Sequence, residues 1–271
     1  MKKALLGLLA ISILVACKND TEKETDVVIH DEVKVSKIEN KTANFPKTLG
    51  NVLEAHGGWE QWNHMNNLCF ELDGKNGTET HTTDLKNRKA KIEHKDWSIG
   101  YDGNQVWLLE NEEDAYSGNA RFYHNLMFYF YAMPFILSDD GIVYSEMEPT
   151  ELDGKLYNGI KVSYKNGVGD SPEDEYKLFF HPDTHKMEWL GYTVTFGKDE
   201  KSDKWSYIKY DDWQEVNGLQ LPRKLTWYNV ENGKPTDERN DLLFSKVTVS
   251  PQKLDASVFA KPEGAVVVPL N

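Results

Sequence analysis

Cysteine is almost absent from this sequence, which has two in 271 residues, Cys17 and Cys69. A framework of intramolecular disulfides is therefore excluded, even though the start of the chain predicts export to an oxidising compartment. Cys69 lies among strand-like residues in "NNLCFELD". We interpret it as a small buried hydrophobic side chain rather than as a catalytic nucleophile.

Basic residues are outnumbered by acidic ones. The chain has 31 lysines and arginines against 44 aspartates and glutamates, a formal net charge of -13. A surface of that charge repels the phosphates of nucleic acids, so no nucleic-acid partner is expected. It also repels anionic lipid headgroups, so any membrane association should come from a covalent anchor and not from a basic face.

Motifs for catalysis and metal binding are missing as well. There is no HExxH, no GxSxG, no glycine-rich phosphate loop and no paired-cysteine spacing. His181 and His185 in "HPDTHK" fall in a predicted hairpin turn and would bind zinc only if a third ligand approached. The acidic stretches "GDSPEDE" and "GKDEKSDK" lack the pattern of a calcium loop. We expect no enzymatic activity, no bound metal and no cofactor. A hydrolase is the third-ranked function, after the two hypotheses given at the end of this subsection, because two carboxylates can come together in space without a local sequence motif.

No apolar run reaches the ~20 residues that a transmembrane helix needs. The first run, residues 4–15, comes after Lys2 and Lys3 and leads into Leu14-Val15-Ala16-Cys17. This pattern predicts a signal peptide over residues 1–16 and resembles that of bacterial lipoproteins. The resemblance implies that the thiol of Cys17 receives lipid, including palmitate-type acyl chains, and anchors the protein to the membrane. The alternative is an ordinary secretory peptide with an incidental cysteine.

Residues 17–45 predict a flexible, lipid-anchored tether. They are highly charged, have no aromatic residue before Phe45 and show no helical apolar period. The valines at 27, 28, 33 and 35 leave open a short added strand. The expected location is the bacterial cell envelope, at the outer membrane and facing periplasm or cell surface.

Residues 46–271 predict a single, mainly β domain. A helix should begin at Pro46 and end at Gly57-Gly58, and "WEQWNHM" predicts a second short helix. Roughly ten strands come next, separated by turn signals at Asp73-Gly74, Asp102-Gly103, Asn166-Gly167, Asn217-Gly218 and Asn232-Gly233. The absence of βαβ alternation favours an antiparallel sheet.

One aromatic segment interrupts this pattern. "NARFYHNLMFYFYAMPFILSDDG" predicts a helix from Asn119 to Ala132, which Pro134 ends. The segment is too short to cross a membrane, and its circumference is apolar on nearly every side. It is therefore either a packed core helix or one wall of a hydrophobic binding cavity, and composition does not separate the two.

Several segments together resemble the LolA/LolB-like superfamily of lipoprotein carriers, and more closely lipid-anchored outer-membrane lipoproteins with that domain. They cover residues 46–264 and include "LEAHGGWEQWNHMNNLCFEL", "YDGNQVW", "RFYHNLMFYFYAMPFILSDDGI", "YNGIKVSY", "YKLFFHPDTHKMEWLGY", "DWQEVNGLQLPRKLTWY" and "LDASVFAKPEG". The resemblance implies a strongly curved antiparallel half-barrel with a few helices closing its concave side. It also implies a hydrophobic interior that takes up acyl chains.

The leading hypothesis is a non-enzymatic, lipid-anchored protein that binds an apolar small molecule or the acyl chain of a lipid or lipoprotein. Because Cys17 would tether the chain, a holder, receptor or sensor is favoured over a shuttling carrier. The alternative is an interaction or sensor module with a filled core that binds an envelope protein. The predicted lining residues are Phe128, Phe130, Met133, Phe135, Ile160, Val162, Leu178, Phe180, Trp189 and Trp227.

Overall fold

The computed structural model describes residues 44–74, 76–165, 171–198 and 200–269. The chain divides into residues 1–41 and residues 42–271, and only the second unit contains described residues. The predicted signal peptide, Cys17 and nearly all of the predicted tether therefore lie outside the described residues. So does the predicted turn at Asn166-Gly167.

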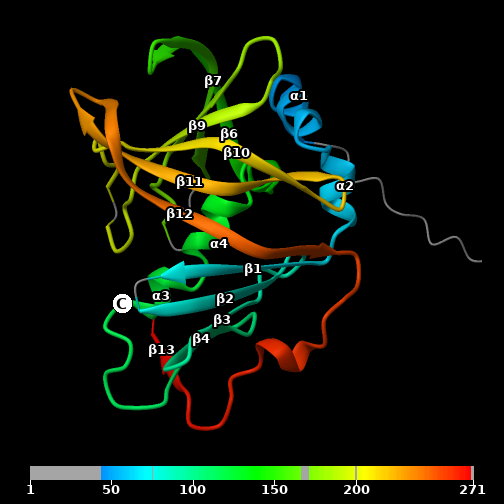
Figure 1. Cartoon of the computed structure of the whole chain (residues 1–271), viewed down its shortest axis with the longest axis vertical. Helices are drawn as coiled ribbons and strands as arrows, with labels where there is room; N and C mark the ends of the chain where they lie inside the picture. The colour runs from blue at the N-terminus through cyan, green and yellow to red at the C-terminus, as the bar shows by residue number, and fades with distance from the viewer. Residues whose placement is uncertain (1–43, 75, 166–170, 199, 270–271) are drawn as a thin grey trace, which may run out of the picture. The chain divides into compact units, whose positions relative to one another are not determined.

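One antiparallel sheet of thirteen strands organises the described part of this unit (Figure 1). The spatial order is β13-β5-β4-β3-β2-β1-β12-β11-β10-β9-β8-β7-β6. The first six strands are β1 (Asn67–Gly74), β2 (Gly77–Asp84), β3 (Ala90–Glu93), β4 (Trp97–Tyr101), β5 (Val106–Glu110) and β6 (Ile142–Leu152). The others are β7 (Lys155–Tyr164), β8 (Tyr176–Phe180), β9 (Met187–Tyr192), β10 (Ser206–Val216), β11 (Leu219–Glu231), β12 (Lys234–Ser250) and β13 (Val266–Val268).

The sheet consists of two meanders, in each of which consecutive strands are neighbours. Strands β1 to β5 form one and β6 to β12 the other, and the pairing of β1 with β12 joins them. Strands β13 and β6 lie at the two edges, so the sheet stays open. The predicted fold class, a curved antiparallel half-barrel with a few helices, is confirmed.

Tight hairpin turns set the register of the second meander. Asn217 and Gly218 between β10 and β11 have φ values of 50° and 79°, and Asn232 and Gly233 between β11 and β12 have 51° and 76°. A two-residue turn with positive φ at both positions matches the right-handed twist of the flanking strands. These two sequence signals therefore correspond to the turns they predicted.

Six short helices accompany the sheet in the part of the chain that the structure describes. They are α1 (Lys47–Ala55), α2 (Trp59–His64), α3 (Ala120–Tyr123), α4 (Leu126–Tyr131) and the 3-10 helices η1 (Phe135–Ser138) and η2 (Ala256–Phe259). The predicted first two helices are confirmed. Gly57 and Gly58 end α1 with φ values of 106° and 91°, which only glycine adopts without strain. An added Cβ on Gly57 would also lie 2.2 Å from the carbonyl oxygen of Gly218.

Two details of the sequence prediction were wrong. The helix expected from Asn119 to Ala132 is interrupted at Asn125, whose φ of -130° and ψ of -1° are not helical, so α3 and α4 are separate. The strand count was also too low, with thirteen strands against roughly ten expected; one strand without a detectable pattern is β2, "GTETHTTD", which has no apolar alternation. Its threonines favour extended backbone, but they leave no hydrophobic pattern to detect.

The two faces of the second meander carry different side chains. Most of the core lies between one face of the sheet and the helices α1, α2, α4 and η1. A smaller cluster of Leu152, Tyr157, Phe179, Trp189, Tyr207 and Tyr228 covers the opposite face. On β8, Leu178 and Phe180 belong to the first cluster and Phe179 to the second, as alternation along a strand requires.

Candidate functional site

Residues 120–138 pack against the core-facing side of the sheet. The part of this segment around Tyr131 and Phe135 is closely packed. Phe135 stacks on Trp62 of α2, with ring centroids 4.8 Å apart and planes 10° apart. Tyr131 contacts Phe70 and Phe244, with centroids 4.6 Å and 4.4 Å away. Tyr131 and Phe135 are both 0% exposed. This part of the segment is core and leaves no room for another molecule beside these rings.

Tyrosine hydroxyl groups bond the carbonyls at the ends of these short helices. The Tyr210 hydroxyl donates to the carbonyl oxygen of Phe130 at 2.7 Å, and the Tyr144 hydroxyl donates to that of Leu137 at 2.7 Å. The last carbonyls of a helix have no partner within the helix, so such donors satisfy them. Each bond contributes about 1 kcal/mol net, and each fixes where the segment lies on the sheet.

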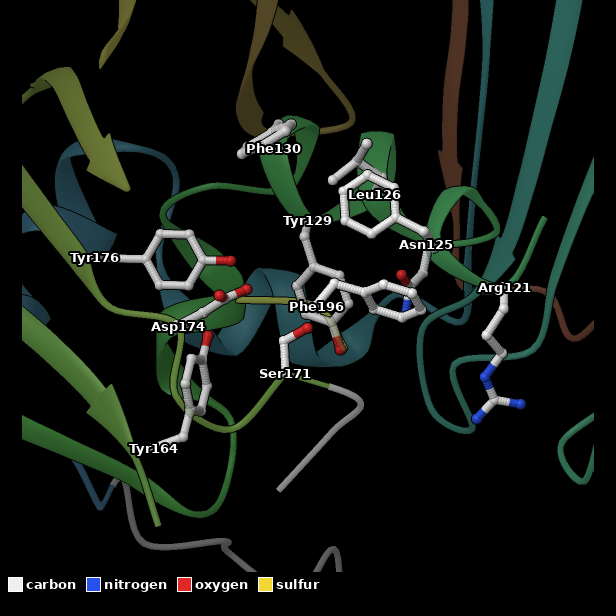
Figure 2. Close-up of a pocket in the computed structure, with 11 residues that line it drawn as sticks. Arg121, Asn125, Leu126, Tyr129, Phe130, Tyr164, Ser171, Asp174, Tyr176 and Phe196 are labelled. Carbon is white, nitrogen blue, oxygen red and sulfur yellow. The ribbon is translucent and has the colours of Figure 1, made fainter. Parts of the chain in front are cut away.

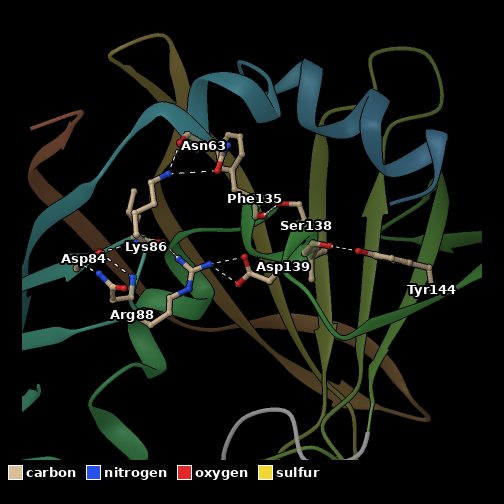
Figure 3. A network of polar contacts seen from close by, with 11 residues as sticks. Asn63, Asp84, Lys86, Arg88, Phe135, Ser138, Asp139 and Tyr144 are labelled. Carbon is tan, nitrogen blue, oxygen red and sulfur yellow. Dashed lines mark hydrogen bonds and ion pairs between the residues drawn. The ribbon is translucent and has the colours of Figure 1, made fainter. Parts of the chain in front are cut away.

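An ion pair holds the end of η1 (Figure 3). Arg88, in the turn between β2 and β3, donates from Nη2 to Asp139 at 2.6 Å and 2.5 Å. The guanidinium carbon of Arg88 also lies 5.3 Å from the ring centroid of Phe128. Arg88 thus contacts α4 and the residue after η1 at once. A bidentate pair of this kind is geometrically specific, although its partial exposure limits its contribution to stability.

A half-open pocket of about 160 Å³ lies at the other end of the segment, beside α3 and α4 (Figure 2). One wall consists of Arg121, Phe122, Asn125, Leu126, Tyr129 and Phe130. The opposite wall comes from the sheet and its loops, through Tyr164, Ser171, Asp174, Tyr176 and Phe196. Engineered cavities of ~150 Å³ admit benzene, so the pocket accommodates a group of similar size.

The one carboxylate among the described pocket residues, Asp174, lies on the sheet side together with two phenols. Asp174 accepts hydrogen bonds at Oδ1 from the backbone N–H and the hydroxyl of Thr195, at 2.6 Å and 2.7 Å. Burial raises the pKa of the Asp174 carboxyl, and the two Thr195 bonds offset only part of that effect. Burial also raises the pKa of the phenols of Tyr164 and Tyr176, which therefore remain neutral hydroxyls at physiological pH.

The ten predicted lining residues are nearly all buried in the core. Nine of them lie in the main cluster on the inner side of the sheet, and Trp189 lies in the cluster on the opposite face. Phe130 alone of the ten is also on the pocket wall. Trp189 faces the opposite side because it alternates with Leu190 and pairs with Phe179, which also faces that side. Glu188 is an extra residue in the β8–β9 ladder, so Met187 pairs with Phe180 and returns to the core face.

The remaining pocket residues were not singled out from the sequence. Tyr164 and Tyr176 lie two residues away from Val162 and Leu178 on the same strand faces, so continuing the alternation would have reached them. Asp174 and Phe196 lie in loops, where no periodicity indicates which side chains meet. Leu126 and Tyr129 are within the aromatic segment, but only the folded arrangement distinguishes them from its closed part.

Two other sequence predictions concern groups away from the pocket. His181 and His185 lie in the turn between β8 and β9, where the backbone N–H of His185 donates to the carbonyl of His181 at 2.9 Å. Among the described residues, no three histidine, cysteine, aspartate or glutamate side chains gather in a way that would hold a metal ion. None of the helices in the described ranges has the length and apolar composition needed to span a bilayer.

A family model matches residues 2–237, which is most of the chain. Its description is "Family of unknown function (DUF6503)". The chain belongs to this family. No curated protein matches the sequence.

The chain is similar in structure to several solved proteins. A LolA superfamily protein from Nitrosomonas europaea is 10% identical with a TM-score of 0.45, over 78% of this chain and 96% of that one. A DUF1329 family protein from Desulfovibrio piger is 13% identical with a TM-score of 0.47, over 79% and 96%. A putative outer membrane lipoprotein-sorting protein domain from Vibrio parahaemolyticus is 8% identical with a TM-score of 0.38, over 79% and 94%.

The names of two of these three solved proteins are of the LolA or lipoprotein-sorting type, to which the sequence was also similar. At these identities and TM-scores the similarity says nothing about a ligand or partner of this chain.

Proposed function

We propose that this DUF6503 protein is a non-enzymatic, lipid-anchored protein of the bacterial envelope that binds an apolar or amphipathic ligand beside α4. The observation that supports this most directly is the half-open pocket, whose wall continues into the hydrophobic core through Leu126, Tyr129 and Phe130. Apolar surface removed from water there contributes about 25 cal/mol per Å².

The size of the pocket limits how a ligand is held. At about 160 Å³ it takes the end of an acyl chain or a compact headgroup, while the rest of the ligand extends outward. Insertion of a whole chain into the interior would require Tyr131 and Phe135, both 0% exposed, to leave their sites. We therefore place the ligand at the pocket and not under η1. Anchoring through Cys17 and an outer-membrane location remain part of the proposal.

Uptake of a fluorescent fatty acid tests the proposal. The full chain carrying Cys17→Ala is titrated with cis-parinaric acid, and oleate is then added as a competitor. We expect saturable binding that Leu126→Glu weakens at least tenfold, because a charge is placed in an apolar wall. The matched control is Leu243→Glu, since Leu243 is 60% exposed on β12. Absence of saturable uptake by the folded parent chain would reject ligand binding.

A second candidate function is supported by the filled interior. If the closed core has only a structural role, the domain would act as an interaction module that contacts an envelope protein through its surface. Leu156 and Leu243 are 58% and 60% exposed and offer apolar contacts on β7 and β12. A photo-crosslinking residue at either position would then yield one discrete adduct in cells, while the same residue at Leu126 would not.

A further inference from the structure

Asp174 and Glu175 are adjacent carboxylates with different surroundings. Glu175 pairs with Lys161 and Lys201, each at 2.9 Å. Burial raises its pKa, but these two hydrogen bonds outweigh burial and lower it below the usual value. Asp174 has no such cation among the described residues. Its Oδ1 accepts both bonds from Thr195, and within the described part of the chain Oδ2 has no hydrogen-bond partner.

Aromatic rings surround the pocket on the side of this carboxylate. Tyr164 and Tyr176 meet edge to face, with centroids 6.1 Å apart and planes 82° apart. In Figure 2 the hydroxyl groups of Tyr164 and Tyr176 point toward the Asp174 carboxylate, and Tyr129 lies across from them. Phenol oxygens accept hydrogen bonds from ammonium groups, and aromatic rings attract cations more strongly when the site is partly desolvated. A carboxylate with one unbonded oxygen, placed among such rings, is a site for a positive group with an apolar surface.

Arg121, the one basic residue among the described residues of the pocket wall, does not occupy this position. In Figure 2 its guanidinium lies at the opposite end and points away from Asp174 and from the ring of Tyr129. The acidic end of the pocket is therefore separate from its basic end. The net charge of the chain, -13, also favours the approach of cations over anions.

We propose that the pocket binds an organic ammonium group, primary or quaternary, between Asp174 and the rings of Tyr129, Tyr164 and Tyr176. The inference rests on the proposed function, since it assigns a ligand class to the same pocket. A trimethylammonium group resembles benzene in bulk, and the cavity accommodates it. The group belongs either to the headgroup of a zwitterionic phospholipid or to a free amine.

Calorimetry with choline and its uncharged isostere, 3,3-dimethylbutan-1-ol, separates charge from shape. We expect the Cys17→Ala chain to bind choline at least about tenfold more tightly than the isostere, because only choline pairs with the carboxylate. Asp174→Asn should remove this preference without changing the affinity for the isostere. Glu173→Gln, which deletes a neighbouring charge that is not on the pocket wall, should retain it.

The outcomes separate this inference from the proposed function. Equal affinities for choline and the isostere, with fatty acid uptake intact, would overturn the ammonium site and leave apolar ligand binding in place. Absence of all three interactions would overturn both. A melting curve confirms that Asp174→Asn is folded. If dihexanoylphosphatidylcholine binds more tightly than choline, the source is a lipid headgroup; the reverse order indicates a free amine, and both orders support the site.

Discussion

The two ends of the aromatic segment use the same kinds of side chain and reach opposite results. At η1, Phe135 and Leu137 are 0% exposed and Ile136 is 2% exposed. At the start of α4, Leu126 and Tyr129 remain half-buried and line an open pocket. Apolar composition is common to both, so it does not determine whether a hydrophobic surface is filled or available.

The difference comes from the groups that pack opposite each end. The η1 end meets Trp62 of α2 face to face and is held by Arg88 and Asp139. The α4 end faces Tyr164, Tyr176 and Phe196, which do not close the space in front of it. Packing of helix α2 against η1 therefore closes the half-barrel at the η1 end. Changes on the two sides should have unequal effects on stability and binding.

The largest expected effect is a cavity in the closed end. Phe135→Ala should lower the free energy of unfolding by about 3–5 kcal/mol, because a fully buried ring is removed from a packed site. Leu126→Ala should cost less than about 2 kcal/mol, because that side chain already borders the pocket. Urea denaturation of both variants measures the difference. Equal losses would show that the two ends are packed alike.

The buried histidine at the end of α1 should make the stability of the protein depend on pH. His56 is 0% exposed, and burial lowers its pKa to about 4, although the Val52 carbonyl it contacts opposes the shift. Between pH 6.5 and 4 the unfolded chain therefore binds a proton that the folded chain does not, and stability falls as pH falls. Lowering the pH from 7.5 to 5 should therefore reduce the free energy of unfolding by about 2 kcal/mol.

His56→Gln isolates this contribution. Its free energy of unfolding should change less with pH than that of the parent chain, while His64→Gln, at an exposed position, should keep the parent's slope. His81 is also buried and has a lowered pKa. It is present in every variant, so its contribution cancels when their pH profiles are compared. Parallel pH profiles for His56→Gln and the parent would mean that His56 is charged or hydrated when folded.

Much of the fold could be predicted because the hairpin and helix signals are local. Asn217-Gly218 and Asn232-Gly233 need only their own backbone angles to form turns, and Gly57-Gly58 ends α1 in the same way. The break at Asn125 was missed because apolar residues flank it on both sides. Strand β2 was missed because its own side chains are too polar to leave a pattern.

The candidate site was predictable only in part, for a physical reason. The aromatic segment was identified, but periodicity gives the face of a strand and not whether a helix fills the space above it. Met187 and Trp189 show a further limit: strict alternation would place them on one face of β9, but the extra residue Glu188 puts Met187 on the core face and Trp189 on the opposite face. Asp174 and Phe196 come from loops, so their meeting with α4 depends on tertiary contacts alone.

A smaller effect is expected from the bond that fixes α4 on the sheet. Tyr210→Phe should cost about 1–2 kcal/mol, because the Phe130 carbonyl loses its donor where water does not reach. Tyr144→Phe should cost less, because Tyr144 is half-buried and its hydrogen bond is less shielded from water than that of Tyr210. Thermal denaturation of the pair measures both. A larger loss for Tyr144→Phe would contradict the closed character of the Phe130 site.

The smallest expected changes in stability should differ in sign between the η1 end and the α4 end. Asp139→Asn removes the partner of Arg88 and should destabilise the fold by up to about 1 kcal/mol, less in high salt, since both side chains are partly exposed. Asp174→Asn should leave stability at neutral pH unchanged or raise it slightly. The pKa of Asp174 is raised by burial, so its ionised form costs folding free energy above that pKa, and the amide oxygen of Asn can still accept from Thr195.

Denaturation at pH 7 in low and high salt compares the two variants directly. A stabilising Asp139→Asn would mean that the ion pair does not compensate its own desolvation. A clear loss of stability in Asp174→Asn would mean that the Asp174 carboxylate is paired within the folded chain. A carboxylate paired in that way could not bind an ammonium ligand. In that case Asp174 would have a structural role at the α4 end, as Asp139 has at the η1 end, and would not serve to bind a ligand.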